Sequence, residues 1–301
     1  GENRIHAVRY TPDDGNVRGI VQIVHGMAEY VERYENLAEF LTKRGILVTG
    51  EDHLGHGKSV SEGGSFGYFC EQDPATVVVR DVHRLKKITE EQYPQVPYII
   101  LGHSMGSFIA RNYLCRYGSG IGGAVIVGTG MQPAGLIFAS KAMAGIQKLF
   151  CGSKHVSHFM DKAAFGGYNK RIDSPRTSSD WLSRNTENVD RYIEDELCGF
   201  TFTVNGFQTL FELIRRLQKQ ENLEKVPQNL PILMVSGAED PVGDYGKGVH
   251  KACDSLKRAG VKNITVKLYE NDRHELLNED DAEVAMEDIW QWICKEIPGI
   301  A

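Results

Sequence analysis

One stretch constrains the fold more than any other, residues 97–114, PYIILGHSMGSFIARNYL. Residues 98–101 form a short apolar run with β-branched side chains between a proline and a glycine, which predicts a buried strand. From residue 107 onward, the apolar residues recur at helical spacing. A strand passes directly into a helix only if the corner residue is strained and its flanks are small, and Gly102 and Gly106 supply small flanks. The sequence therefore predicts a strand, a sharp turn at Ser104, and a helix.

This turn has a chemical use. It lifts the Ser104 hydroxyl above the sheet at the start of the following helix, where the helix dipole stabilises a developing anion. The pattern G-x-S-x-G also arises by chance in a chain with 32 glycines. The strand and helix predicted around it favour the interpretation of Ser104 as a nucleophile.

The rest of the chain alternates between predicted strands and helices, with one long interruption. Strands are expected at 4–10, 19–24, 46–49, 98–101, 124–127, 232–236 and 264–269, and helices at 34–44, 73–93, 107–114, 207–218, 245–258 and 282–296. This alternation predicts an α/β fold whose central sheet is mostly parallel, with helices on both faces. Between 131 and 206 no convincing strand occurs, so we interpret 131–206 as a helical cap inserted into a core made of 1–130 and 207–301.

The predicted cap begins with an amphipathic helix. Its apolar stripe consists of Leu136, Ala139, Met143, Ile146 and Phe150. Such a stripe usually packs on the protein core, but the same pattern is compatible with lining an acyl pocket or contacting a lipid surface.

Two loops after strands supply candidates for the groups that would activate the serine. Loops at the carboxyl ends of parallel strands meet at one edge of a sheet, so GAEDPV and ENDRHE should converge on Ser104. A serine needs a base, and the base needs an orienting group, which nominates His274 and Asp240. Glu239 and Asp272 are rivals for the acid, although Asp272 also fits the role of a turn residue.

Other histidines offer weaker alternatives. His250 lies within a predicted helix, and His103 should point away from Ser104 by strand alternation. Asp52, His53 and His56 suggest a metal site, but a tight glycine loop does not easily bring all three onto one ion. We therefore expect neither a metal nor a cofactor.

Composition excludes several classes of function. The net charge is −6 and the basic residues are scattered, which argues against a nucleic-acid partner. No apolar run approaches the ~18 residues of a membrane span, and GENRIHAVRY lacks the blocks of a secretion signal. The six cysteines form no C-x-x-C pair, so we expect reduced thiols and a cytoplasmic protein.

Several motifs together resemble a known family. HGMAEYVERY, DHLGHGKS, GHSMGS, GAEDPVG and the late His274 are similar to the monoacylglycerol lipase and lysophospholipase branch of the α/β-hydrolases, particularly its bacterial serine hydrolases. The resemblance implies the α/β-hydrolase fold with a helical cap, Ser104 as nucleophile with Asp240 and His274 as partners, and the backbone N–H groups of Met27 and Met105 as an oxyanion hole. The chain departs from the commonest motif in having a serine after Gly106 where a second glycine is frequent.

The resulting expectation is a serine carboxylic ester hydrolase that acts on a small lipid ester such as a monoacylglycerol. Alternatives are a lysophospholipase, an aminopeptidase or amidase on the same fold, and a binding or receptor protein with a slow triad. Basic and acidic residues nearly balance in 131–206, which favours a neutral ester over a charged one. A transient contact of the cap with a membrane or micelle surface is a further expectation.

Overall fold

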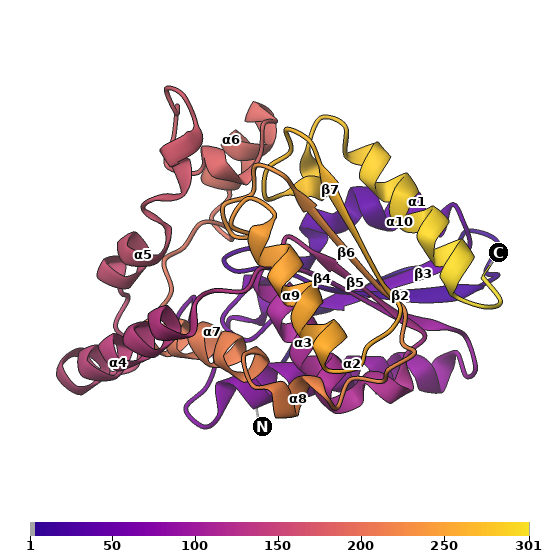
Figure 1. Ribbon diagram of the computed structural model, residues 1–301, viewed down its shortest axis with the longest axis horizontal. Helices are drawn as coiled ribbons and strands as arrows, with labels where there is room; N and C mark the ends of the chain where they lie inside the picture. The colour runs from indigo at the N-terminus through magenta and orange to yellow at the C-terminus, as the bar shows by residue number, and fades with distance from the viewer. Residues whose placement is uncertain (1–3, 301) are drawn as a thin grey trace.

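A seven-stranded sheet forms the centre of the protein in a computed structural model that describes residues 4–300 (Figure 1). The strands are β1 Ala7–Tyr10, β2 Gly19–Val24, β3 Ile46–Glu51, β4 Tyr98–His103, β5 Gly123–Val127, β6 Ile232–Gly237 and β7 Ile264–Tyr269. Their order across the sheet is β1-β3-β2-β4-β5-β6-β7. Strand β1 runs antiparallel to β3, whereas all other neighbours are parallel. The predicted mostly parallel sheet is thereby confirmed.

Helices cover both faces of this sheet. They are α1 Glu35–Thr42, α2 Pro74–Gln92, α3 Met105–Tyr117, α4 Ala134–Cys151, α5 His158–Phe165, α6 Thr186–Glu194, α7 Val204–Leu217, α8 Gln220–Leu223, α9 Lys247–Arg258 and α10 Ala282–Glu296. Helices α1 and α10 contribute to the apolar core on one face, and α2, α3, α7 and α9 to the core on the other. Strands β2 to β6 are buried along their whole length, which explains their nearly continuous apolar sequences.

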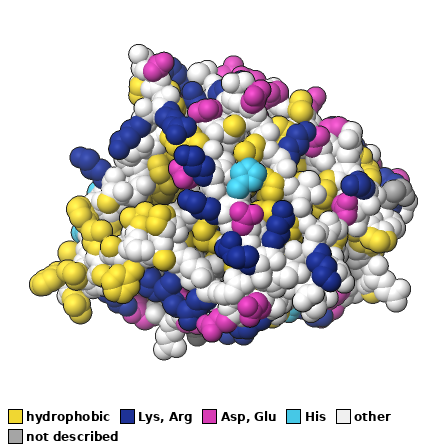
Figure 2. Space-filling model, in the orientation of Figure 1, with side chains coloured by type: hydrophobic (Ala, Val, Ile, Leu, Met, Phe, Trp, Pro, Cys, Tyr) yellow, Lys and Arg dark blue, Asp and Glu magenta, His cyan; other side chains and the backbone are white. Residues whose placement is uncertain are grey.

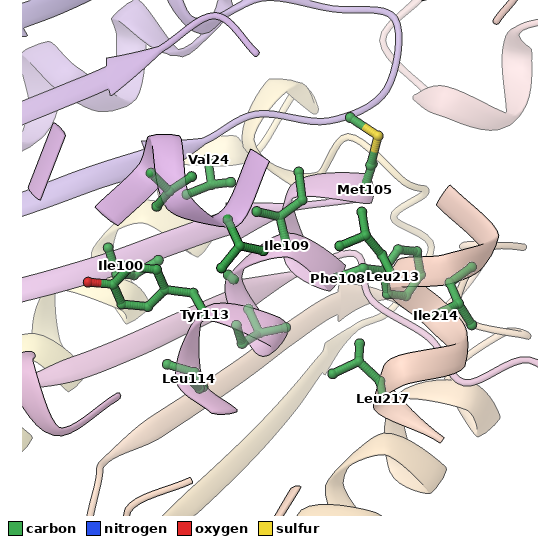
Figure 3. Packing of buried hydrophobic residues seen from close by; sticks show 14 of the residues in the cluster. Val24, Ile100, Met105, Phe108, Ile109, Tyr113, Leu114, Leu213, Ile214 and Leu217 are labelled. Atoms are coloured by element: carbon green, nitrogen blue, oxygen red, sulfur yellow. The ribbon is translucent and has the colours of Figure 1, made fainter. Parts of the chain in front are cut away.

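Helix α3 is held in place by α7. In Figure 3, Phe108 of α3 lies beside Leu213, Ile214 and Leu217 of α7 in one buried cluster. Helix α7 begins at Val204, three residues before the predicted start, because the Thr203 hydroxyl accepts a hydrogen bond from the Gly206 amide (3.2 Å) and caps the helix.

Between β5 and β6 the chain makes a long excursion from the sheet. Helices α4, α5 and α6 lie together to one side of the sheet in Figure 1. Among the described residues, the only strand-like pairing within 131–206 is an isolated bridge between Val156 and Thr203. The division into core and cap remains a prediction, because α7 packs against both α3 and α4 and so joins the two parts.

Helix α4 buries a different set of residues from the predicted stripe. Ile137 and Ala144 are its buried side chains, whereas Leu136, Ile146 and Phe150 are 55%, 59% and 86% exposed. Packing of the whole stripe against the core was therefore a wrong expectation. Helix α4 contacts α7, and much of its apolar surface is not buried by that contact.

Exposed apolar side chains are concentrated in this region. Of the ten large hydrophobic residues that are exposed in the described chain, seven fall between 136 and 159: Leu136, Phe138, Ile146, Leu149, Phe150, Val156 and Phe159. Figure 2 shows hydrophobic side chains gathered at the lower left, over α4. Between residues 4 and 300, no helix has the length and apolar character needed to cross a membrane.

Candidate active site

Ser104 occupies the sharp turn that the sequence predicts. It joins β4 to α3 with φ 54° and ψ −122°, a conformation that side-chain-bearing residues rarely adopt. A Cβ atom on Gly106 would lie 1.9 Å from the carbonyl oxygen of Val24, and one on Gly102 would lie 2.4 Å from the carbonyl oxygen of Gly106. Both flanking glycines are therefore required by close backbone contacts, as expected for this turn.

The structure brings Ser104, His274 and Asp240 into one hydrogen-bonded chain. The Ser104 Oγ lies 2.7 Å from His274 Nε2, and His274 Nδ1 lies 3.0 Å from Asp240 Oδ2. The three residues follow β4, β7 and β6 respectively, at the carboxyl edge of the sheet. Asp240 is fully buried, and its Oδ1 accepts the Val242 amide (2.8 Å), so the carboxylate is fixed in orientation.

The rival residues have other partners. Asp272 forms an ion pair with Arg184 (2.5 Å) rather than contacting His274. The side chains of Glu239 and His250 are exposed. Both positions therefore lie outside the chain of hydrogen bonds that reaches Ser104.

His103 lies closer to the site than strand alternation suggests. Its Nε2 lies 3.1 Å from the carbonyl oxygen of His274, and its Nδ1 lies 2.8 Å from the Tyr34 hydroxyl. As expected, it does not contact the Ser104 hydroxyl. It supports the loop that carries His274, a role that the sequence did not indicate.

Met27 and Met105, the predicted oxyanion-hole residues, line the same cavity as Ser104. Met105 is the first residue of α3, where amides have no helical acceptor, and Met27 follows Gly26 in the loop after β2. A Cβ atom on Gly26 would lie 3.0 Å from the Cβ of Ser104, which places this loop directly against the serine. Among the residues described, neither amide donates a hydrogen bond to another group of the protein.

The residues considered for a metal site are engaged elsewhere. Asp52 accepts the amides of Val31 (2.9 Å) and Lys58 (2.8 Å). His53 and His56 are buried, and burial lowers the pKa of both imidazoles. Within residues 4–300, one group has metal-ligand spacing, formed by His6, Glu32 and Asp52.

A lysine ammonium group already binds one of these three residues. The Lys58 ammonium lies 2.5 Å from Glu32 Oε1, and His6 Nε2 lies 3.0 Å from the same oxygen. The arrangement is that of a surface ion pair.

A cavity of about 750 Å³ opens above Ser104 and His274. Most of its wall is apolar. Five methionines and seven aromatic residues line it: Met27, Met105, Met131, Met143, Met160, Phe108, Phe165, Tyr168, Trp181, Tyr192, Phe200 and Phe211. The Trp181 ring centre lies 5.1 Å from that of His274. Leu136, Ile137 and Met143 of α4 contribute to the wall, so part of the predicted stripe lines the pocket.

A buried ionic network lies beneath the site, and the sequence did not predict it. Arg33 lies between Glu29 and Glu275, which are 4% and 3% exposed. Glu29 belongs to the loop that carries Met27, and Glu275 follows His274. The positions of the two acids next to candidate site residues could have indicated a role at the site. Isolated charged residues, however, normally indicate a solvated surface.

Comparisons with known proteins agree with this geometry. Residues 15–281 match the Hydrolase_4 family, described as "Serine aminopeptidase, S33". The chain is 29% identical to the monoglyceride lipase of Rattus norvegicus over 273 residues, covering 90% of this chain and 80% of the relative. It is 27% identical to the monoacylglycerol lipase of Mycolicibacterium smegmatis over 289 residues, covering 96% and 92% of the two chains.

Among solved structures, a highly thermostable carboxyl esterase from Bacillus coagulans in complex with glycerol superposes with a TM-score of 0.92. It is 30% identical, and the match covers 100% of this chain and 96% of the esterase. Together these findings show that the chain belongs to the Hydrolase_4 family and is a serine hydrolase with the α/β-hydrolase fold.

Proposed function

We propose that the protein hydrolyses a neutral lipid ester such as a monoacylglycerol, with Ser104 as nucleophile. The observation that carries this proposal is the hydrogen-bonded chain of Ser104, His274 and Asp240 at the floor of an apolar cavity. His274 takes the Ser104 proton as the hydroxyl attacks the ester carbonyl, and it returns a proton to the departing alcohol. Asp240 holds the imidazole in the required tautomer and stabilises its cation.

The negative charge on the tetrahedral intermediate needs donors that are already in place. The amides of Met27 and Met105 have this role in the proposal, because both residues line the same cavity as Ser104 and neither amide has an acceptor within the described protein. In the second half of the reaction, His274 activates a water molecule that cleaves the acyl-enzyme.

The cavity wall supports the choice of substrate. Methionine and aromatic side chains accommodate an acyl chain, and each buried methylene contributes about 0.8 kcal/mol. The similar proteins named above include monoglyceride and monoacylglycerol lipases and an esterase crystallised with glycerol. Residues 131–206, which supply much of the wall, would act as a cap, and their exposed apolar side chains would contact a lipid surface.

Labelling with a fluorophosphonate tests the catalytic proposal. We expect one labelled site, Ser104, because only an activated serine beside an oxyanion hole reacts with such a probe. Ser104→Ala should abolish both labelling and ester turnover. Labelling that survives this substitution would remove Ser104 from its role.

A series of esters tests the substrate. We expect kcat/KM to rise with acyl length until the cavity is full, and Met143→Asp to flatten that rise while acetate ester turnover is retained. Ala142→Asp is the matched control, since Ala142 is exposed on α4 and does not line the cavity. Faster cleavage of lysophosphatidylcholine than of a monoacylglycerol of equal chain, or preference for an aminoacyl arylamide, would contradict the proposal.

A further inference from the structure

The loop that carries Met27 is held by a buried carboxylate. Glu29 Oε1 accepts hydrogen bonds from the Gly26 amide (2.5 Å) and the Tyr34 hydroxyl (2.8 Å), and it lies 3.2 Å from His103 Nδ1. A Cβ atom on Gly26 would lie 2.5 Å from this oxygen and 3.0 Å from the Cβ of Ser104. Gly26 is therefore confined between the Glu29 carboxylate and the nucleophile.

The second oxygen of the same carboxylate connects the loop to the base. Glu29 Oε2 accepts a hydrogen bond from Arg33 Nη1 (3.0 Å), and the same guanidinium binds both oxygens of Glu275 (2.7 and 2.8 Å). Asn188 Nδ2 also donates to Glu275 (2.6 Å). Because Glu275 follows His274 directly, Arg33 ties the Met27 loop to the His274 loop.

The charged groups in this network stabilise each other's ionised forms. Burial by itself raises the pKa of a carboxyl group, but His103 and Arg33 outweigh that effect and lower the pKa of Glu29. Burial opposes the charged form of His103, and Glu29 reverses this and raises its pKa. A buried ionised carboxylate with partners on both oxygens is rigid, because moving it would leave charges unpaired.

We propose that Glu29 is a positioning residue for the oxyanion hole. Its Oε1 binds the amide of the His25–Gly26 peptide and so holds the backbone that leads into Met27 against Ser104, and its Oε2 couples that loop through Arg33 to the loop of His274. This inference rests on the proposed function, in which Met27 donates to the oxyanion. Loss of one oxyanion donor lowers kcat by about 10² to 10³. A donor that is displaced but still present should cost less.

Two conservative variants separate the roles of the two oxygens. Glu29→Asp keeps the charge but is shorter by one methylene, so it withdraws the acceptor from Gly26. Glu29→Gln keeps an oxygen for Gly26, Tyr34 and His103 but places an amide against Arg33. We expect Glu29→Asp to lower kcat by about tenfold to a hundredfold, with KM changed less than about threefold. Glu29→Gln should lose less than about tenfold.

A tetrahedral mimic supplies a readout that a purely structural role would not change. An acyl trifluoromethyl ketone adds to the serine and places an oxyanion in the hole, so its Ki should rise by the same factor as kcat falls. Melting temperatures of the same variants show how much of each change in kcat comes from lost stability. Glu32→Gln is the matched control, because Glu32 lies three residues away and pairs with Lys58 and His6 instead.

The outcomes are distinct. If Glu29→Gln loses as much kcat as Glu29→Asp, or if Ki does not follow kcat, positioning through Gly26 is wrong. If Glu29→Asp does not fold, Glu29→Gln decides. A loss above about tenfold overturns positioning through Gly26, and a smaller loss with a matching rise in Ki supports it. A wild-type protein that neither turns over esters nor reacts with fluorophosphonate would instead overturn the proposed function.

Discussion

Two aspartates lie near His274, and only one contacts it. Asp240 lies 3.0 Å from His274 Nδ1, whereas Asp272 is bound to Arg184. Asp240→Asn should lower kcat by about 10³ to 10⁴, because the imidazole loses both its tautomer and the stabilisation of its cation. Asp272→Asn should leave kcat almost unchanged. Steady-state kinetics on a soluble ester would check this pair, and the reverse pattern would move the acid to Asp272.

Gly106 should tolerate no side chain. A Cβ atom there would lie 1.9 Å from the Val24 carbonyl oxygen, so Gly106→Ala must displace α3 from β2. We expect it to cost at least about 1–3 kcal/mol of stability and to lower the melting temperature or prevent folding. Gly135→Ala in α4 is the control, because no atom lies within 4 Å of the added Cβ. Equal melting temperatures for the two variants would contradict this account.

The turn at Ser104 was predictable because its determinants are local. A strand, a serine between two small residues and a helix follow one another within a few positions. The Glu29–Arg33–Glu275 network was not, because Arg33 and Glu275 are 242 positions apart and only the folded sheet makes them neighbours. His103 was assigned no role for the same reason, since its partners come from two other segments, residues 29–34 and the loop of His274.

Among the helices, α4 carries the most exposed apolar surface. Leu149 and Phe150 are 84% and 86% exposed. Replacing both by serine should lower binding to phosphatidylcholine vesicles at least severalfold, because each buried side chain contributes about 1.5–3 kcal/mol. Turnover of a soluble acetate ester should not change.

Cosedimentation with vesicles measures the effect. Val284→Ser in α10 is the control, because Val284 is also exposed (55%) but lies far along the chain from α4. Vesicle binding that is unaffected by the double substitution would exclude α4 as the contact surface.

Sequence periodicity predicted where helices and strands begin and end better than it predicted which elements they pack against. The predicted bounds of β7 and α10 agree with the structure, since turn residues mark both ends of each element. For α4, the period correctly indicated an amphipathic helix, but not what covers its apolar face. The choice between core, cavity and solvent depends on α7, which is distant in the chain.

Glu212 of α7 links the predicted core to the predicted cap, because it binds Lys141 of α4. Its oxygens accept hydrogen bonds from Arg215 (2.6 and 2.8 Å), Arg216 (3.1 Å) and Lys141 of α4. Burial alone would raise the pKa of this carboxyl, but these three partners lower it to about 2. A carboxyl whose pKa falls on folding stabilises the native state above its unfolded pKa, and this stabilisation is lost as the pH falls through the folded pKa.

Glu212→Gln should therefore lower the melting temperature most at neutral pH. The difference from the wild-type protein should persist down to about pH 4.5 and shrink as the pH falls toward 2. Glu221→Gln is the control, because Glu221 is 70% exposed and forms its ion pair with the exposed Lys219. Thermal melts across this pH range would contradict the account if the Glu212 difference stayed constant.

The order of strands has a consequence for the newly made chain. Ser104 follows β4 and His274 follows β7, with β5 and β6 between them in the sheet and 170 positions between them in the sequence. In the proposed mechanism, Ser104 therefore leaves the ribosome long before His274 and stays an unactivated alcohol until β7 has paired with β6. By the same mechanism, a chain interrupted before β7 should not cleave esters, and the onset of ester cleavage during refolding should report that the whole sheet is complete.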